Sequence, residues 1–185
     1  MKIKALLYCC KEKNRGDRLV RDEHYGNPFW LYGAITYNYE SLNGKIACEC
    51  EVETEELTPI GRDMFITETL DCFEILRHSC LKIEELSDYL YNSYKDSKGY
   101  ALHTSNVKER VMELSDVFSI KDTGGFIVTK PIQKAPQNMQ WCWVYENGKW
   151  VKYLLISIRP QWLCKILNGE KDIEVRRKVL KGVCE

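Results

Sequence analysis

The chain has 185 residues, of which 44% are hydrophobic and 29% charged, and its 27 basic and 27 acidic side chains balance to a formal net charge of zero. This composition predicts a folded chain rather than a disordered one, because it supplies enough apolar surface for a core. No apolar run reaches the roughly eighteen residues of a membrane span, and the first apolar stretch is too short for a signal peptide. Zero net charge excludes a broadly basic protein that binds nucleic acid over its whole surface, but it allows a local basic cleft.

The chain contains nine cysteines, an odd number, and no export signal precedes them. Both features favour a reduced, cytoplasmic protein whose thiols are mostly buried. The close pairs are Cys9-Cys10 and Cys48-Glu49-Cys50, and neither has the C-x-x-C spacing of a zinc site. A metal site would therefore require the fold to gather distant residues. We predict core cysteines, no metal, no cofactor, no membrane partner and one domain over residues 1–185.

Residues 2–9 are dense in apolar side chains and predict a strand. The polar, glycine-punctuated residues 11–27 predict a surface loop. The short aromatic runs 29–32 and 35–37 fit either packing or the lining of a cleft.

Asn43-Gly44 is a turn signal, and a strand with a period of two follows it over residues 46–53. Its apolar side chains alternate with Ala47 and three glutamates, and the acidic face is expected to be solvated.

Residues 65–76 are ambiguous between strand and helix. The spacing of apolar residues over 83–90 predicts a short amphipathic helix, and residues 93–99 predict a loop. Residues 100–111 predict a strand, whereas residues 121–140 hold Gly124-Gly125 and two prolines and predict mostly loop.

The apolar runs 141–145 and 150–156 flank Asn147-Gly148, which is a strong hairpin signal. Pro160 then suits the first turn of a helix over residues 160–167, and Gly169 suits its end. A strand over residues 172–176 follows, so the local order is strand, helix, glycine turn and strand.

Residues 169–176 form the pattern G-x-K-x-x-E-x-R. In a strand, Glu174 and Arg176 share a face, and Lys171 lies in the turn that leads into it. A carboxylate between two cations stays ionised and can accept hydrogen bonds from a ligand, while the cations can donate to phosphate or carbonyl groups. The alternative is an ion-pair cluster at the surface of a strand edge.

The preceding strand ends in S-I-R-P at Pro160, and a helix connects it to the G-x-K-x-x-E-x-R pattern. This strand, helix and pattern together resemble the opening of the ASCH (activating-signal-cointegrator homology) domain of the PUA-like superfamily. Arg159 stands where that domain often has lysine. Residues 99–106 (G-Y-A-L-H-T-S-N) resemble the G-Y-x-W-H-I-S-N/D element of small bacterial and phage ASCH proteins, with Leu102 in place of the tryptophan. Residues 136–142 resemble their P-P-Q-S-W-C ending, and residues 4–11 resemble their K-V-x-I-Y-C-T-K strand.

The resemblance implies an α+β fold, a PUA-like mixed β-barrel with a few short helices. In those relatives the G-x-K-x-x-E-x-R segment comes first, whereas in this chain it comes last. We therefore expect a circularly permuted ASCH fold in which residues 146–153 form the new link. Permutation requires the original ends to be neighbours, so Met1 and Glu185 should lie within about 20 Å, the reach of about six extended residues.

The resemblance also implies a cleft that binds RNA or a modified nucleoside through lysine, arginine and glutamate. Trp141 or Trp162 could stack on a base there, although Trp162 also lies at core spacing on its helix and packing is the alternative for both. The ligand-binding residues expected beside that cleft are Ser157, Arg159, Arg176, His103, Ser105 and Trp141.

Two other functions remain open. Some small ASCH proteins are amidohydrolases acting on N4-acetylcytidine, and others have been linked to RNA cleavage. In this reading Lys171 and Glu174 are catalytic, but Glu174 occupies a position where the amidohydrolases have threonine. It would therefore act as a general base and not as a hydroxyl nucleophile. The third interpretation is a protein-interaction factor of a phage or other mobile element.

Overall fold

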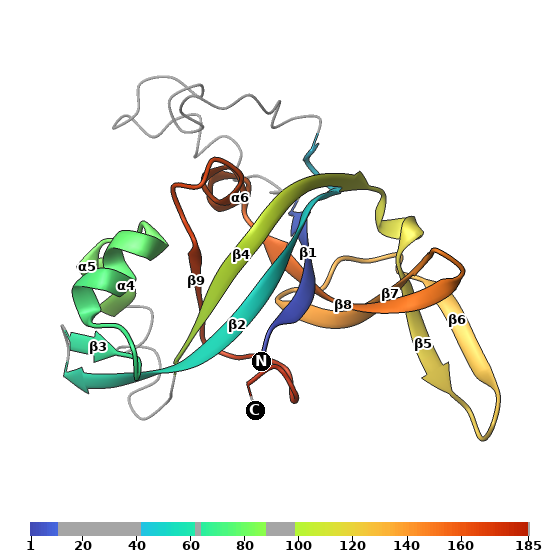
Figure 1. Cartoon of the computed structure of the whole chain (residues 1–185), viewed down its shortest axis with the longest axis horizontal. Helices are drawn as coiled ribbons and strands as arrows, with labels where there is room; N and C mark the ends of the chain where they lie inside the picture. Colours follow the sequence, from blue (N-terminus) through green and yellow to red (C-terminus); the bar gives the residue numbers. More distant parts are fainter. Residues whose placement is uncertain (11–41, 62–63, 88–98, 185) are drawn as a thin grey trace. The chain divides into compact units, whose positions relative to one another are not determined.

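A computed structural model of the chain describes residues 1–10, 42–61, 64–87 and 99–184 (Figure 1). These residues are mostly strand, with a few short helices. The strands are β1 (Ile3–Cys9), β2 (Ile46–Gly61), β3 (Met64–Ile66), β4 (Gly99–Met112), β5 (Phe118–Asp122), β6 (Ile127–Pro131), β7 (Met139–Glu146), β8 (Lys149–Ile158) and β9 (Ile173–Arg176). The helices are α4 (Cys72–Ser79), α5 (Ile83–Ser87), the 3₁₀ turn η2 (Leu114–Asp116) and α6 (Pro160–Leu167).

The strands form one mixed sheet in the order β6-β5-β7-β8-β1-β2-β4-β9, and β3 pairs with β2. β1 and β8 run parallel, whereas β7 and β8, β5 and β6, and β4 and β9 run antiparallel. The chain is therefore an α+β protein, as the sequence predicts.

Most local predictions are confirmed. The hairpin of β7 and β8 turns at Asn147 and Gly148, whose φ angles of 51° and 75° are those of a type I′ turn. Helix α6 begins with Pro160 in its first turn, and Gly169 follows it with φ 74°. β2 starts at the predicted residue and extends eight residues beyond the predicted strand, to Gly61.

Two regions hold more regular structure than the sequence indicated. Residues 121–140, expected to be mostly loop, hold the end of β5, all of β6 and the start of β7. Gly124 and Gly125 are the turn of the β5–β6 hairpin, with φ angles of 66° and 94°. The ambiguous residues 65–76 contain the end of β3 and the start of α4, whose N-cap Asp71 accepts a hydrogen bond from the Glu74 N–H.

Several predictions lie outside the described residues. They are the loop over 11–27, the aromatic runs 29–32 and 35–37, most of the loop over 93–99, and the end of the helix over 83–90.

The described residues group into two compact units, each built from separate segments of the chain. Unit 1 comprises Met1–Ile3, Glu51–Asn106 and Gly169–Glu185, and unit 2 comprises Lys4–Cys50 and Val107–Asn168. Each has its own buried cluster. In unit 1 these residues are Leu57, Ile75, Leu86, Ala101, Ile173 and Val175. In unit 2 they are Leu6, Tyr8, Ile46, Val117, Ile132, Cys142, Val144, Tyr153 and Leu155.

The cysteines are core residues, as predicted. Six of the nine are buried and the other three are partly exposed. Burial raises the pKa of Cys142 and of Cys164 to about 12, so both stay protonated at neutral pH. Among the described residues, no three His, Cys, Asp or Glu side chains are grouped so as to hold a metal ion. No helix in the described part of the chain is long and apolar enough to span a membrane.

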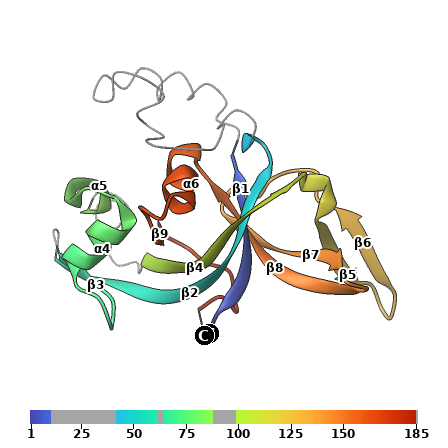
Figure 2. The same ribbon diagram turned by 45° about the horizontal axis from the view of Figure 1, so that its top comes forward.

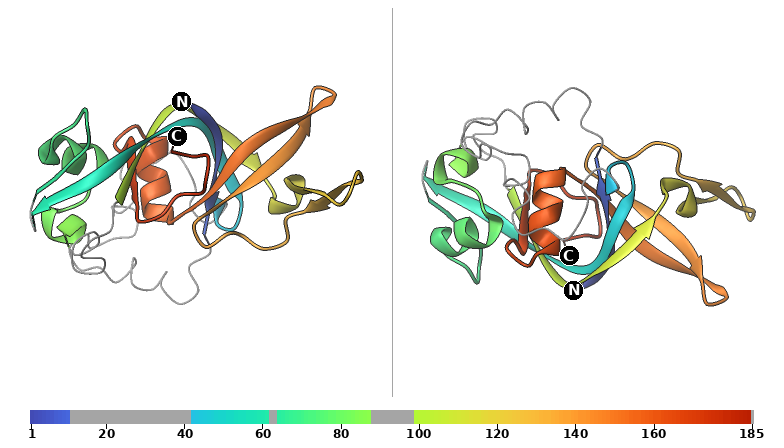
Figure 3. Two further views of the ribbon diagram at one scale, coloured as in Figure 1. Left: turned by 90° about the horizontal axis from the view of Figure 1, so that it is seen from below. Right: turned by 90° about the horizontal axis from the view of Figure 1, so that it is seen from above.

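The N-terminal residues and the last described residues of the chain, up to Cys184, both belong to unit 1 and lie close together (Figures 1, 2 and 3). The Met1 amino group is 3.4 Å from the Glu53 carboxylate. The Cys184 thiol lies against the carbonyl oxygen of Thr54, which follows Glu53 on β2. Met1 and Cys184 therefore meet the proximity that a permuted fold requires. Glu185 itself lies outside the described residues.

Candidate functional site

The Lys171 side chain is buried, and only 1% of it is exposed. Its Nζ atom donates to the carbonyl oxygens of Ser79, at 2.6 Å, and Ile173, at 2.7 Å, and lies 3.3 Å from Glu174 Oε2. Ser79 is the last residue of α4, so the ammonium also sits at the negative end of a helix. Three oxygen partners thus compensate a charge that has been removed from water.

Burial lowers the pKa of Lys171, and the neighbouring Glu174 carboxylate opposes that shift. Glu174 in turn pairs with Arg176, whose Nη2 lies 3.0 Å from Glu174 Oε1. The three charges of the G-x-K-x-x-E-x-R pattern therefore converge, as the sequence predicts. The alternative of an ion-pair cluster at a strand edge agrees with these pairs on β9, the last strand in the sheet order, but the cluster is not exposed at the surface, since the side chains of Glu174 and Arg176 are only 12% and 13% exposed.

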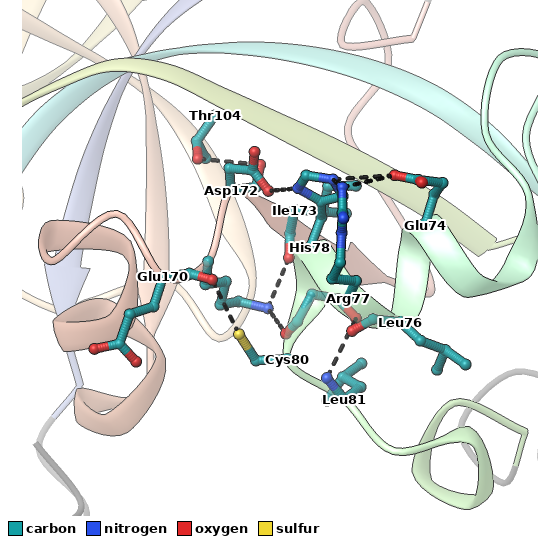
Figure 4. A network of polar contacts seen from close by, with 12 residues as sticks. Glu74, Leu76, Arg77, His78, Cys80, Leu81, Thr104, Glu170, Asp172 and Ile173 are labelled. Atoms are coloured by element: carbon teal, nitrogen blue, oxygen red, sulfur yellow. Dashed lines mark hydrogen bonds and ion pairs between the residues drawn. The ribbon is translucent and has the colours of Figure 1, made fainter. Parts of the chain in front are cut away.

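Next to this cluster, His78 on α4 faces the residue that follows Lys171 (Figure 4). His78 Nδ1 lies 2.8 Å from Asp172 Oδ1, and its Nε2 lies 3.2 Å from Glu74 Oε2 and 3.1 Å from Arg77 Nη2. The backbone is tied at the same point, because the Asp172 N–H donates to the His78 carbonyl at 3.0 Å. The end of α4 and the start of β9 are thus joined through both side chain and backbone.

His103 on β4 forms a second histidine–carboxylate pair in unit 1. Its Nε2 lies 3.2 Å from Glu55 Oε2, and the Thr69 hydroxyl donates to the other oxygen of Glu55 at 2.7 Å. Burial works to raise the pKa of Glu55, but hydrogen bonds from Thr69, Thr67 and His103 outweigh it, and the pKa is lowered. Glu55 therefore remains a carboxylate at neutral pH.

Both histidine–carboxylate pairs line one pocket of about 430 Å³, which we call the histidine pocket. Its lining residues come from β2, β4, α4, the segment before α4 and the start of β9. They are Glu53, Glu55, Thr69, Leu70, His78, His103, Asp172 and Ile173. A second pocket of the same unit, about 670 Å³, is lined by Thr54, Glu55, Glu56, Thr58, Ile66, Thr67, Glu68 and Cys184.

The structure thus brings some of the predicted site residues together. His103 lines the histidine pocket. Lys171, Glu174 and Arg176 form a chain of ion pairs, and the residues between Lys171 and Glu174, which are Asp172 and Ile173, line the pocket. Ser105, also in unit 1, is a partly buried residue of β4.

The other predicted ligand-binding residues belong to unit 2. Ser157 is buried and its hydroxyl donates to the Pro136 carbonyl at 2.5 Å. Arg159 is exposed at the N-cap of α6. Trp141 is partly buried on β7, and the Lys152 ammonium lies 4.1 Å from its ring centre.

The acidic face of β2, made of Glu49, Glu51 and Glu53, was expected to be solvated, and this holds only in part: the Glu53 side chain is 52% exposed and that of Glu51 36% exposed, although each lies in an ion pair. Glu49 pairs with Lys108 and Arg110, and its side chain is only 18% exposed. Glu55 is 23% exposed and holds His103. Sequence reasoning missed Glu55, His78 and Asp172 as pocket residues. Their partners are 48 and 94 positions away, and no local pattern connects residues at such separations.

No protein-family model, curated protein or solved structure matches this chain.

Proposed function

We propose that this protein binds a nucleoside, or a single base of an RNA, in the histidine pocket. The observation that carries the proposal is the convergence of Glu55–His103 and His78–Asp172 on one pocket of about 430 Å³. We further propose that the chain has a circularly permuted ASCH fold of the PUA-like superfamily. The β8–α6–β9 order and the adjacent chain ends support that part.

The chemistry of the lining favours a base over a phosphate. Three carboxylates, from Glu53, Glu55 and Asp172, supply hydrogen-bond acceptors, and no lysine or arginine is among the lining residues of this described pocket. A carboxylate accepts well from an exocyclic amine such as cytosine N4, whereas it repels a phosphate. Leu70 and Ile173 add apolar contact for a ring. The expected ligand is therefore an amino-bearing nucleoside without a terminal phosphate.

Binding is favoured over hydrolysis by the state of the two residues expected to be catalytic. A catalytic group must come within hydrogen-bonding reach of its substrate. The Lys171 ammonium is instead held by three oxygen atoms and is closed off from solvent, and Glu174 sits between two cations. Both act as structural supports of the pocket wall in this proposal.

The proposal is tested by calorimetric titration with cytidine, adenosine and uridine. Cytidine and adenosine should bind more tightly than uridine, which lacks the exocyclic amine, and cytidine more tightly than its 5′-monophosphate. Glu55→Gln should weaken binding about tenfold or more, because a charged acceptor is replaced by a neutral one. Glu113→Gln, an exposed glutamate of unit 2, is the matched control and should bind as wild type does.

Equal affinity for all three nucleosides, no binding, or unchanged affinity in Glu55→Gln would overturn the proposal. Incubation with N4-acetylcytidine followed by chromatography separates binding from turnover. Release of cytidine by the wild-type chain, retained in Glu113→Gln, would establish the hydrolase alternative instead.

A further inference from the structure

The β7–β8 hairpin of unit 2 has two contrasting faces. Directly opposed residues of an antiparallel pair point to the same side of the sheet. Cys142, Val144 and Tyr153 point into the core of unit 2. The other side carries a row of large aromatic residues, because the pairs Tyr145–Trp150 and Trp143–Lys152 and the neighbouring pair Phe118–Trp143 all face that way. We call Phe118, Trp141, Trp143, Tyr145, Trp150 and Lys152 the aromatic face.

The aromatic face is open to solvent at its centre and hairpin end. Tyr145 is 59% exposed and Trp150 40% exposed, and Lys152 is also exposed. The Trp150 ring centre lies 5.2 Å from those of both Phe118 and Tyr145, in edge-to-face geometry. Aromatic side chains usually bury their large apolar area, so an exposed cluster of this kind marks an interaction surface.

The positive charge of the face lies among the rings. The Lys152 ammonium is 4.1 Å from the Trp141 ring centre and 5.7 Å from that of Trp143. Asp122 also lies in these rows of the described strands, and its carboxylate accepts a hydrogen bond from the Gly125 N–H at the tip of the β5–β6 hairpin, away from the tryptophans. The face is therefore complementary to an anionic partner with flat apolar groups.

We infer that the aromatic face is a stacking surface for single-stranded nucleic acid. Successive aromatic residues on β7 are two positions apart, which separates them by about 6.8 Å along the strand. That is about twice the 3.4 Å repeat of stacked bases, so the spacing of the aromatic positions matches every second base of a stacked strand. Stacking on aromatic side chains, with a cation for the backbone, is how many proteins hold single strands without reading their sequence. The inference rests on the proposed function and extends it from one base to a strand.

The experiment measures fluorescence anisotropy of labelled ten-nucleotide oligo(A), as RNA and as DNA, titrated with the full chain. Both strands should bind, a duplex of the same sequence should bind much more weakly, and binding should quench tryptophan fluorescence. Tyr145→Ala and Trp150→Ala should each weaken strand binding about 5-fold to 150-fold, the range for losing one stacked base. Lys152→Gln should weaken it and reduce the slope of log affinity against log salt by about 0.7. Phe73→Ala is the matched control, because Phe73 is an exposed aromatic residue of α4 that lies outside the face.

The outcomes separate this inference from the proposed function. Glu55→Gln should weaken nucleoside binding about tenfold or more while leaving most of the strand affinity, and Trp150→Ala should weaken strand binding while leaving most of the nucleoside affinity. Strand binding that is unchanged in both Tyr145→Ala and Trp150→Ala overturns the stacking surface even where nucleosides bind. Self-association of the chain that is lost in the same two variants, without any strand binding, also overturns it and assigns the face to a second copy of the protein.

Discussion

Replacing Lys171 by methionine tests whether the centre of the sequence motif is structural. The substitution keeps the length of the side chain but removes a charge that three oxygen atoms hold. The carbonyl oxygens of Ser79 and Ile173 then lose a donor in a buried position, and Glu174 loses one of its two cations. Removing one partner of a buried ion pair costs about 3–5 kcal/mol, because the remaining groups have already lost their contact with water.

That loss is a large part of the 5–15 kcal/mol by which a typical domain is stable. At a urea m-value of about 2 kcal/mol/M, the unfolding midpoint should fall by about 2 M. Tryptophan fluorescence and far-ultraviolet circular dichroism should report the same midpoint. Lys82→Met, at an exposed lysine of unit 1, is the control and should change the free energy of unfolding by less than about 0.5 kcal/mol.

A double-mutant cycle isolates the ion pair. Glu174→Gln alone should destabilise the protein, and adding it to Lys171→Met should cost less than the sum of the single changes, because the pair has already been broken. A loss below about 1 kcal/mol for Lys171→Met would refute the structural role. It would mean that the contacts of the ammonium contribute little to stability, and the motif would then need a role other than support of the fold.

Three further outcomes are expected. Gly148→Ala should cost about 1–2 kcal/mol in urea unfolding, since φ is 75° at that turn position, whereas Asn147→Gly should be nearly neutral. Burial works to raise the pKa of Glu49, but hydrogen bonds from Lys108 and Arg110 outweigh it and the pKa is lowered below 4.5. The stability that the Glu49 carboxylate contributes is therefore present above pH 4.5 and is lost as the pH falls through the lowered pKa. The urea unfolding midpoint, measured from pH 7 to pH 3, should depend less on pH in Glu49→Gln than in wild type. Thiol labelling of the native protein at pH 8, followed by mass spectrometry, should modify Cys10, Cys80 and Cys184 well before the six buried cysteines. Equal labelling rates for all nine cysteines would contradict their burial.

The local elements could be predicted because their signals lie within a few residues of one another. Alternation defined the start of β2, Asn147-Gly148 defined the turn of the β7–β8 hairpin, and Pro160 with Gly169 bounded α6. The β5–β6 hairpin was missed because its glycines were interpreted as signals for a loop, although the same residues fit a tight turn between two strands.

The candidate site could be predicted only over short separations in sequence. The convergence of Lys171, Glu174 and Arg176 follows from their spacing on one turn and strand. Their burial does not, because it depends on the end of α4, 92 positions before Lys171. Glu55 was not predicted as a site residue for a related reason, since its partner His103 is 48 positions away on another strand.

The buried motif and the histidine pocket are linked through two consecutive residues. Lys171 holds the Ser79 carbonyl at the end of α4, and the Asp172 N–H holds the carbonyl of His78, one residue earlier. Asp172 and His78 both line the pocket. The lysine therefore serves the pocket by positioning its wall, without touching a ligand.

This positioning role predicts a local change in hydrogen exchange. Two backbone amides report on the pocket wall: the Asp172 N–H donates to the His78 carbonyl at 3.0 Å, and the Thr104 N–H donates to the Asp172 carbonyl at 2.8 Å. Both amides should exchange faster in Lys171→Met than in wild type. Amides of the β7–β8 hairpin in unit 2 should keep their rates in the same sample. If Asp172 and Thr104 exchange as slowly as before, the pocket wall is held by the His78–Asp172 pair alone. The charged motif would then need a different explanation.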